Sequence, residues 1–281
     1  MTKKLSGYIS LIMIIVLFSL TLVGCGNAKN DQGASGDSSE EVKSSLDKIK
    51  DSNKIVLGTS ADYPPYEFHK QIDGKDEIVG FDIEVAKEIA KDLGVELEIK
   101  DMDFDGLLAA LDTGNVDFVV AGMTATDDRK KSVDFSKEYY TEDQGLLIPT
   151  ADKDKYQSID DLKDLKVGAQ KGTVQEEVAE EKIEGAQVKT LAKITDLVLE
   201  LKNGKINGLV LAIPVAEAYA AANPDLTLSP HIDLGKGDGI AIAVKKGNQE
   251  LVDIMNATID RLMEDDTLDK FIQDATALSE E

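Results

Sequence analysis

Short apolar segments alternate with amphipathic segments along most of the chain, and no other feature of the sequence constrains the fold so strongly. In the first part, β-branched and apolar runs predict strands at residues 54–59, 95–99 and 116–120. Between them, apolar residues at helical spacing predict a helix up to Leu93 with Asp82 as its N-cap, and a second helix at 103–111. Strands and helices that alternate in this way favour parallel sheets with right-handed crossovers, so we expect an α/β protein.

The same alternation starts again after residue 145. Strands are predicted at 145–149, 166–169, 186–190 and 206–212, and helices at 174–183, 195–201 and 215–222. A last strand at 240–244 is followed by a long amphipathic helix and by a short helix at 268–272. A chain of 281 residues has room for one large domain or for two of roughly 100 to 150 residues each.

The first 24 residues have the features of a secretory signal. Lys3 and Lys4 precede an apolar run from Tyr8 to Val23 that is too short and too asymmetrically flanked for a membrane span. The run ends in LVGC, which resembles a bacterial lipobox, so we expect cleavage before Cys25 and acylation of its thiol, for example with palmitate. An uncleaved anchor helix with a spare cysteine is the alternative. Because Cys25 is the only cysteine, an internal disulfide and a multi-cysteine metal site are excluded.

Residues 26–45 are rich in small and polar residues and contain almost no large apolar ones. Such a segment cannot bury enough apolar surface to offset the entropy of ordering, so we assign residues 25–52 to the lipidated cysteine and a flexible tether. The lipid would hold the folded part on the extracytoplasmic face of the cell membrane. We expect this part to be a monomer.

The chain is strongly acidic. It has 54 Asp and Glu residues against 31 Lys and Arg residues, which gives a formal net charge of -23. A surface of this charge repels phosphate backbones and anionic lipid headgroups, so we expect no nucleic-acid partner. Solubility is the simplest role of the charge.

A candidate anion site lies in AGMTATDDRKKSVDFSKEYY, residues 121–140, directly after a predicted strand. Thr126 and Asp127 mark the start of a short helical segment, so the backbone amides of residues 122–126 are predicted to be unpaired and to point outwards. Arg129 follows about one helical turn later. A guanidinium beside free amides suits a carboxylate, because its planar donors match two oxygens at once. The alternative is a surface arginine beside an ordinary helix cap.

Three motifs follow one another along the chain: GTSADYPPYEF at 58–68, GFDIEVA at 80–86, and G-M-T-x-T-x-x-R-x-x-x-V-x-F-S from residue 122. Together they resemble the family of extracellular receptors for polar amino acids that serve ABC importers, and the resemblance covers roughly residues 53–272. It implies a periplasmic-binding-protein-like fold, in which two lobes with mixed sheets are joined by a two-strand hinge.

On this resemblance, lobe one is discontinuous and comprises residues 53–144 and 240–281, while residues 145–239 form lobe two with the hinge crossings. Four glycines lie where a hinge needs permissive backbone angles: Gly145, Gly235, Gly237 and Gly239. The family pattern places the ligand between the lobes, at the carboxyl ends of the strands.

The resemblance also implies roles for residues of lobe one. Arg129 and the Thr124 amide would bind the α-carboxylate of the ligand, and Gly122 would offer its carbonyl to the ammonium group. Tyr63 and Phe104 would flank the ligand side chain, with core packing as the alternative for both aromatic rings.

Lobe two contributes a second set of positions. Gln170 would contact a polar end of the ligand or its carboxylate, and Thr173 with the nearby amides would begin a helix at the site. The other expected binding positions are Ser60, Ala121 and Val174.

One position departs from the family pattern. The family usually has an acidic residue two positions before Pro214, to pair with the ligand ammonium, and this chain has Ala212. A buried unpaired ammonium would be costly. Therefore either another acid, namely Asp62, Glu67 or Asp238, reaches the cleft, or the ligand lacks a standard free α-amine.

The leading hypothesis is a receptor that binds an amino acid or a close relative and delivers it to the permease of an ABC importer. One alternative is a dehydratase-like cleft enzyme acting on a small carboxylate, with Glu67 or Asp238 as its acid or base. A sensor or adhesin that keeps the fold is another. His69 and His231 are the only histidines and lie far apart in sequence, so we expect no metal, no cofactor and no histidine-based catalysis.

Overall fold

The structure of the chain is a computed structural model that describes residues 44–280. The predicted signal segment, Cys25 and most of the predicted tether lie outside these residues. Within the described part, none of the helices is long and apolar enough to cross a membrane.

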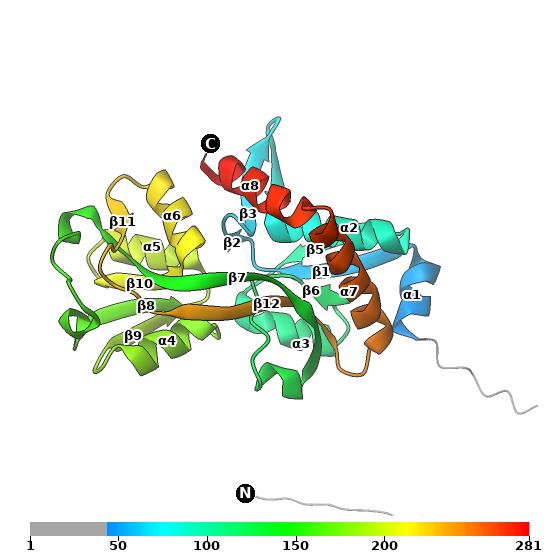
Figure 1. The fold of residues 1–281 in the computed structure, drawn as a ribbon, viewed down its shortest axis with the longest axis horizontal. Helices are drawn as coiled ribbons and strands as arrows, with labels where there is room; N and C mark the ends of the chain where they lie inside the picture. Colours follow the sequence, from blue (N-terminus) through cyan, green and yellow to red (C-terminus); the bar gives the residue numbers. More distant parts are fainter. Residues whose placement is uncertain (1–43, 281) are drawn as a thin grey trace, which may run out of the picture. The chain divides into compact units, whose positions relative to one another are not determined.

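Lobe one combines a mixed sheet, a small antiparallel sheet and five helices (Figure 1). In the mixed sheet, β1 (Lys54–Thr59) pairs in parallel with β5 (Glu96–Asp101) and β6 (Phe118–Val119). The small sheet consists of β2 (Asp62–Tyr63), β3 (Glu67–Ile72) and β4 (Lys75–Val79). The helices are α1 (Ser45–Ser52), α2 (Phe81–Leu93), α3 (Leu107–Asp112), α7 (Gln249–Glu264) and α8 (Thr267–Glu280), and two short 3₁₀ helices, η1 (Phe104–Gly106) and η2 (Arg129–Lys131), accompany them.

Lobe two has its own parallel strands, with helices between them. Its strand β8 (Lys166–Gln170) pairs in parallel with β9 (Gln187–Leu191) and with β10 (Gly208–Ala212). The helices are α4 (Val174–Lys182), α5 (Ile194–Lys202) and α6 (Ile213–Ala222), and the short elements are β11 (Leu226–Leu228), η3 (Thr150–Asp152) and η4 (Ile159–Leu162).

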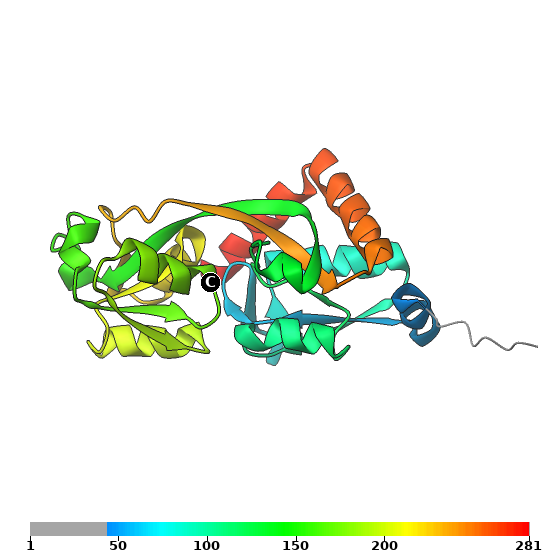
Figure 2. The same cartoon turned by 90° about the horizontal axis from the view of Figure 1, so that it is seen from below.

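Two long strands connect the lobes, β7 (Val133–Pro149) and β12 (Lys236–Lys245). They pair with each other in antiparallel fashion, and β7 continues into lobe two, where it pairs with β10 and β11. Figure 2 shows both strands passing between the lobes on one side. The predicted α/β class and the two-lobe fold are thereby confirmed, and the two predicted crossings are parts of these two strands.

The four glycines predicted at the hinge serve mainly through their lack of a side chain; they are Gly145, Gly235, Gly237 and Gly239. Only Gly235 has a left-handed backbone, with φ at +89°. At Gly237, a Cβ atom would lie 2.2 Å from the backbone oxygen of Glu142, so only glycine lets β7 and β12 approach so closely here. The expectation of permissive angles therefore holds for one of the four glycines, and close packing explains Gly237.

The predicted tether extends too far along the chain. Residues 45–52 form α1, which begins with a capping box between Ser44 and Asp47 and buries Ile49 in the core. The few apolar residues of this segment are spaced to place Ile49 against the body of lobe one, and this burial stabilises a helix that the composition of the preceding residues does not suggest.

Candidate functional site

A narrow pocket lies between the lobes, and twelve residues line it. All ten predicted binding residues are among them, and two further residues, Glu67 and Gln175, complete the lining. The ten are Ser60, Tyr63, Phe104, Ala121, Gly122, Thr124, Arg129, Gln170, Thr173 and Val174.

The lining comes from the ends of strands and the starts of helices in both lobes. Lobe one contributes the loop after β1, the strands β2 and β3, η1, and the segment from the end of β6 to η2. Lobe two contributes the end of β8 and the start of α4. Carboxyl ends of parallel strands are where α/β proteins usually bind ligands.

Arg129 reaches across the pocket from lobe one to lobe two. Its Nη1 donates to the carbonyl oxygen of Thr124 at 2.8 Å, and its Nη2 donates to the carbonyl oxygen of Gly172 at 2.9 Å. Its Cζ lies 5.3 Å from the centre of the Phe104 ring. Burial lowers the pKa of Arg129 from its ordinary value, yet a guanidinium stays charged at any physiological pH. The pocket therefore contains a fixed positive charge.

The backbone amides of residues 122–126 are less free than predicted. Gly122 donates its N–H to Asp82 Oδ2 at 2.7 Å, and Thr126 donates its N–H to the Thr124 carbonyl at 3.0 Å. Asp82 is therefore no helix cap. It lies inside α2, is fully buried, and accepts from Gly122 and from the Tyr139 hydroxyl at 2.8 Å. A tertiary contact takes up the Gly122 donor and a local turn takes up that of Thr126, so Arg129 is the principal candidate to bind an anion.

Gly122 is required by its backbone and by its neighbour. Its φ of +53° lies in the left-handed region, and a Cβ atom would lie 2.8 Å from Cε1 of Tyr63. The motif glycine therefore lets the Tyr63 ring lie directly against the backbone beside the pocket.

Tyr63 connects the pocket to the crossing strands. Its hydroxyl donates to Glu142 Oε1 on β7 at 2.8 Å. Gln175 Nε2 of α4 lies 3.4 Å from the same hydroxyl and donates to Gln144 Oε1 on β7 at 2.9 Å. These contacts join lobe one, lobe two and a crossing strand in one buried network.

Three buried carboxyl groups lie close enough to interact at the pocket, those of Glu67, Asp82 and Glu142. Glu67 is fully buried and lines the pocket. Among the described residues no N–H or hydroxyl group donates to its carboxyl oxygens, and the polar group that interacts with them is the carboxyl of Asp82. Burial, reinforced by the charges of Asp82 and Asp62, raises the pKa of Glu67 well above its usual range.

The other two members of this group are perturbed in the same direction. Burial raises the pKa of Asp82 to about 6 and the pKa of Glu142 to about 7. No set of three or more His, Cys, Asp or Glu side chains in residues 44–280 is arranged to hold a metal ion. A cation beside Glu67 would favour the ionised form of its carboxyl group and pair with it.

Only one of the three acids that could substitute for the family's acidic residue at position 212 lines the pocket. Glu67 lines the pocket, whereas Asp62 lies outside the lining and is bound by lobe two. Asp238 is exposed on β12. Ala212 itself is fully buried as the N-cap of α6 and lies outside the pocket lining.

Sequence reasoning missed Gln175 and the buried partners Glu142 and Asp82. Gln175 directly follows a predicted site residue at the start of α4, so its neighbourhood was a usable signal. Nothing local indicates that Glu142 is buried, because it lies between Thr141 and Asp143 in a polar stretch of β7.

Comparisons with known proteins support a common origin over nearly the whole described part. The sequence model for bacterial extracellular solute-binding proteins, family 3, matches residues 55–275. The arginine-binding extracellular protein ArtP of Bacillus subtilis is 36% identical over 264 residues, which cover 92% of this chain and 93% of that protein. A probable histidine-binding protein of Campylobacter jejuni is 33% identical and covers 92% of this chain and 95% of its own.

A solved structure of an amino acid-binding protein is also similar to this chain. The amino acid ABC transporter substrate-binding protein AbpA of Streptococcus pneumoniae, bound to L-arginine, superposes with a TM-score of 0.80 at 40% identity and covers 83% of this chain and 99% of its own. With the two-lobe fold and the interlobe pocket, these similarities show that the chain belongs to family 3 of the bacterial extracellular solute-binding proteins.

Proposed function

We propose that this protein is a lipid-anchored extracytoplasmic receptor that captures an amino acid with a cationic side chain between its lobes and delivers it to an ABC importer. The lobes, residues 53–144 with 240–281 and residues 145–239, close over the ligand by bending at the crossing strands. Acylated Cys25 holds the receptor at the membrane.

The observation that carries this proposal is that a guanidinium and a buried acidic side chain line one pocket. Arg129 supplies a positive charge that suits the α-carboxylate. Glu67 supplies a buried carboxyl group whose pKa is raised in the empty pocket, and a cationic group of the ligand beside it would favour its ionised form and pair with it. A ligand with a carboxylate and a separate positive group satisfies both residues.

The aromatic residues fit the same ligand. Tyr63 and Phe104 line the pocket, and aromatic faces attract guanidinium and ammonium groups. Two of the similar proteins described above are named for arginine or were solved with it, which favours arginine as the first ligand to test.

A thermal-shift screen tests the proposal. The wild-type protein is mixed with each standard amino acid and with ornithine and citrulline, and arginine, lysine and ornithine are expected to raise the melting temperature most. Arg129→Ala is expected to abolish these shifts, whereas Arg261→Ala is the matched control, because Arg261 pairs with Glu88 and Asp92 on the surface of lobe one. Equal shifts in the Arg129→Ala protein would contradict the carboxylate assignment.

The dehydratase-like alternative rests on the raised pKa of Glu67, since a buried neutral carboxyl group can act as a general acid. Mass spectrometry of the ligand after long incubation with the protein separates the two functions. We expect unchanged ligand; a dehydrated or deaminated product would favour an enzyme.

The lipid anchor is tested by membrane fractionation of cells that express the full chain. We expect the protein in the membrane fraction, and we expect Cys25→Ser to release it into the soluble fraction. Retention of the Cys25→Ser protein in the membrane would contradict acylation of this residue.

A further inference from the structure

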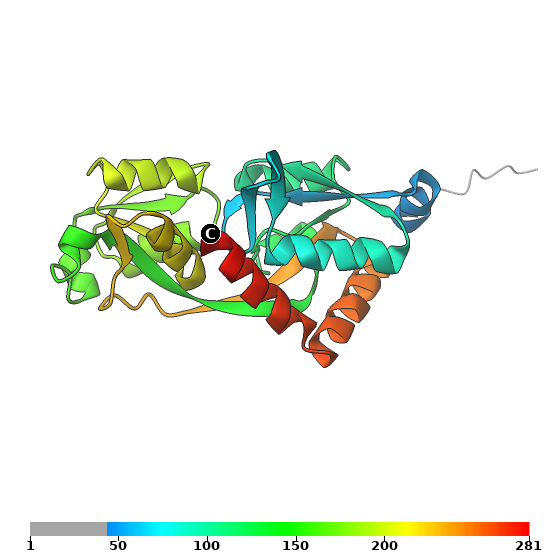
Figure 3. The ribbon, with the colours of Figure 1, turned by 90° about the horizontal axis from the view of Figure 1, so that it is seen from above.

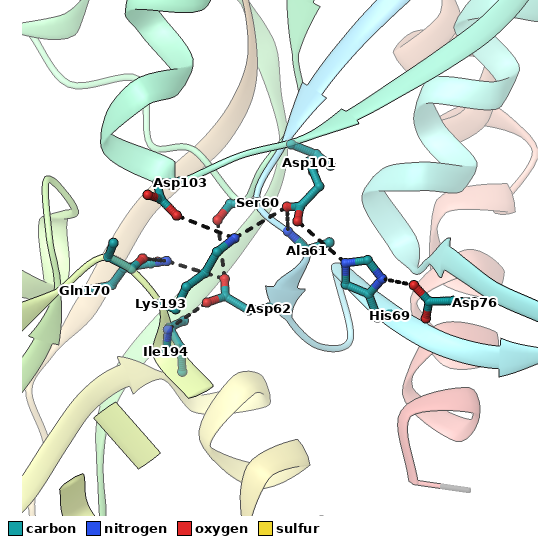
Figure 4. A network of polar contacts seen from close by, with 12 residues as sticks. Ser60, Ala61, Asp62, His69, Asp76, Asp101, Asp103, Gln170, Lys193 and Ile194 are labelled. Carbon is teal, nitrogen blue, oxygen red and sulfur yellow. Dashed lines mark hydrogen bonds and ion pairs between the residues drawn. The ribbon is translucent and has the colours of Figure 1, made fainter. Parts of the chain in front are cut away.

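Asp62 lies next to the pocket but outside its lining, and its contacts run from lobe one to lobe two (Figure 4). Its Oδ2 accepts from the backbone N–H of Ile194, the first residue of α5, at 2.6 Å. Its Oδ1 lies 3.4 Å from Nε2 of Gln170 at the end of β8. Its backbone oxygen accepts from the hydroxyl of Tyr219 on α6 at 2.8 Å.

The helix that Asp62 meets has no N-terminal cap from its own chain segment. The N-cap position of α5 is Lys193, whose side chain forms no capping hydrogen bond and cannot accept one. Ile194 is fully buried, so its N–H has no access to water when the lobes are together. The carboxylate of Asp62 satisfies this donor and also lies at the positive end of the helix dipole.

Lys193 reinforces the same contact from lobe two. Its Nζ lies 3.6 Å from Asp101 and 3.7 Å from Asp103, both of lobe one. Asp101 in turn accepts from the Ala61 N–H at 2.8 Å, which holds the segment beside Asp62 in place (Figure 4).

The contact stabilises only the arrangement in which the lobes are together. When the lobes separate, both the carboxylate of Asp62 and the first amide of α5 return to water. When they meet, both groups are buried, and each satisfies the other. A hydrogen bond to a charged group is stronger than one between neutral groups, so the contact favours closure.

We propose that Asp62 is a positioning residue for ligand capture: it caps α5 of the opposite lobe, holds lobe two over the bound ligand and so sets the rate at which the ligand leaves. It does so without touching the ligand. This inference rests on the proposed function only for its ligand, since closure itself can be measured without one.

The first experiment measures lobe closure directly. Spin labels are placed on Lys91→Cys in α2 and Glu181→Cys in α4, both exposed, in a chain that carries Cys25→Ser. Distances between the labels are recorded with and without L-arginine. We expect Asp62→Ala to shift the population towards longer distances in both conditions, and Asp62→Asn, which keeps an acceptor oxygen but loses the charge, to shift it less.

The second experiment measures binding kinetics with L-arginine. Asp62→Ala is expected to speed dissociation by roughly 10- to 100-fold, the loss of one buried charge-assisted hydrogen bond, while association changes little. The order of preference among amino acids is expected to stay the same, because Asp62 does not line the pocket. Asp105→Ala is the matched control: it removes another interlobe ion pair, with Lys171, whose side chain is 60% exposed, so dissociation is expected to change less than about threefold.

Unchanged label distances and unchanged dissociation in Asp62→Ala would overturn the inference. A changed order of ligand preference would also overturn it, because it would make Asp62 a ligand contact. Thermal unfolding without ligand identifies a variant that fails to fold, and Asp62→Asn then provides the measurement. If the wild type binds no amino acid, the proposed function fails, and the distances of the ligand-free proteins still test the role of Asp62.

Discussion

Glu67→Gln is the substitution that most directly tests the charge arrangement of the pocket. Glutamine has nearly the same shape as glutamate, so the change removes the acidic group and leaves the packing of β3 intact. In the wild type, no N–H or hydroxyl group of the described residues donates to the fully buried Glu67 carboxyl group. It is therefore available to a cationic group of the ligand.

The expected loss of affinity follows from this burial. Removing one partner of a buried ion pair costs about 3 to 5 kcal/mol, because the remaining charge is left unpaired. For arginine, this corresponds to a dissociation constant that is higher by roughly 10² to 4 × 10³-fold. L-citrulline, which has nearly the same shape as arginine but no charge on its side chain, is expected to bind the Glu67→Gln protein at least as well as the wild type.

Glu67→Gln is expected to weaken arginine binding but to raise the stability of the ligand-free protein. Glu67 lies close enough to Asp82 for each to affect the pKa of the other, and the charge of Glu142 also acts on it. Removing one of these like charges lowers the electrostatic repulsion in the cluster, so the melting temperature at about pH 8 should rise. A protein that is more stable and yet no longer binds arginine excludes misfolding as the cause.

Isothermal titration calorimetry with L-arginine and L-citrulline measures both affinities. Glu98→Gln is the matched control, because Glu98 is an exposed acid on β5 that pairs with Lys54. Arginine affinity within about threefold of the wild type would refute the pairing with Glu67. An equal loss for arginine and citrulline would refute the side-chain assignment and place the α-ammonium at Glu67.

Three further predictions address the pocket and its surroundings. Ala212→Asp puts the acid that is usual in the family at a buried helix N-cap outside the pocket lining, so arginine affinity in calorimetry is expected to stay within about threefold of the wild type. Tighter binding would show that an acid at this position reaches the ligand ammonium. Because burial raises the pKa of Asp82 to about 6 and that of Glu142 to about 7, the folded state binds protons more tightly than the unfolded state. The stability that these groups contribute is therefore fully present below about pH 4 and is lost as the pH rises to about 7, by on the order of 3 kcal/mol for each group. The melting temperature of the ligand-free protein should therefore fall between about pH 5 and pH 8. A rise over this range would contradict the raised pKa values of Asp82 and Glu142. Gly122→Ala is expected to destabilise the protein and weaken arginine binding, because its Cβ would meet the Tyr63 ring at 2.8 Å; Gly74→Ala, which has a φ of +77° and open space around it, should destabilise without affecting binding.

Much of the fold was predictable because it follows from local patterns. The strand predicted at 54–59 is β1, and the helix predicted at 174–183 is α4 within one residue. Apolar periodicity determines which face of each element is buried, and that property needs no knowledge of distant residues. The elements that were missed are those that depend on partners elsewhere. The hairpin of β3 and β4 is polar on one face, and β7 continues as one strand of 17 residues because β12 and then β10 pair with it.

The sequence by itself indicated the family and the alternation of most strands and helices, because its motifs and apolar periodicity are local, and the family resemblance then implied ten residues that come together in one pocket. Only the tertiary structure decided the charges inside that pocket. Whether Glu67 is paired, whether the Gly122 amide is free and whether Asp62 caps α5 depend on residues up to 132 positions apart. Burial and hydrogen bonding between such distant residues arise only when the chain is folded, so no local pattern records them.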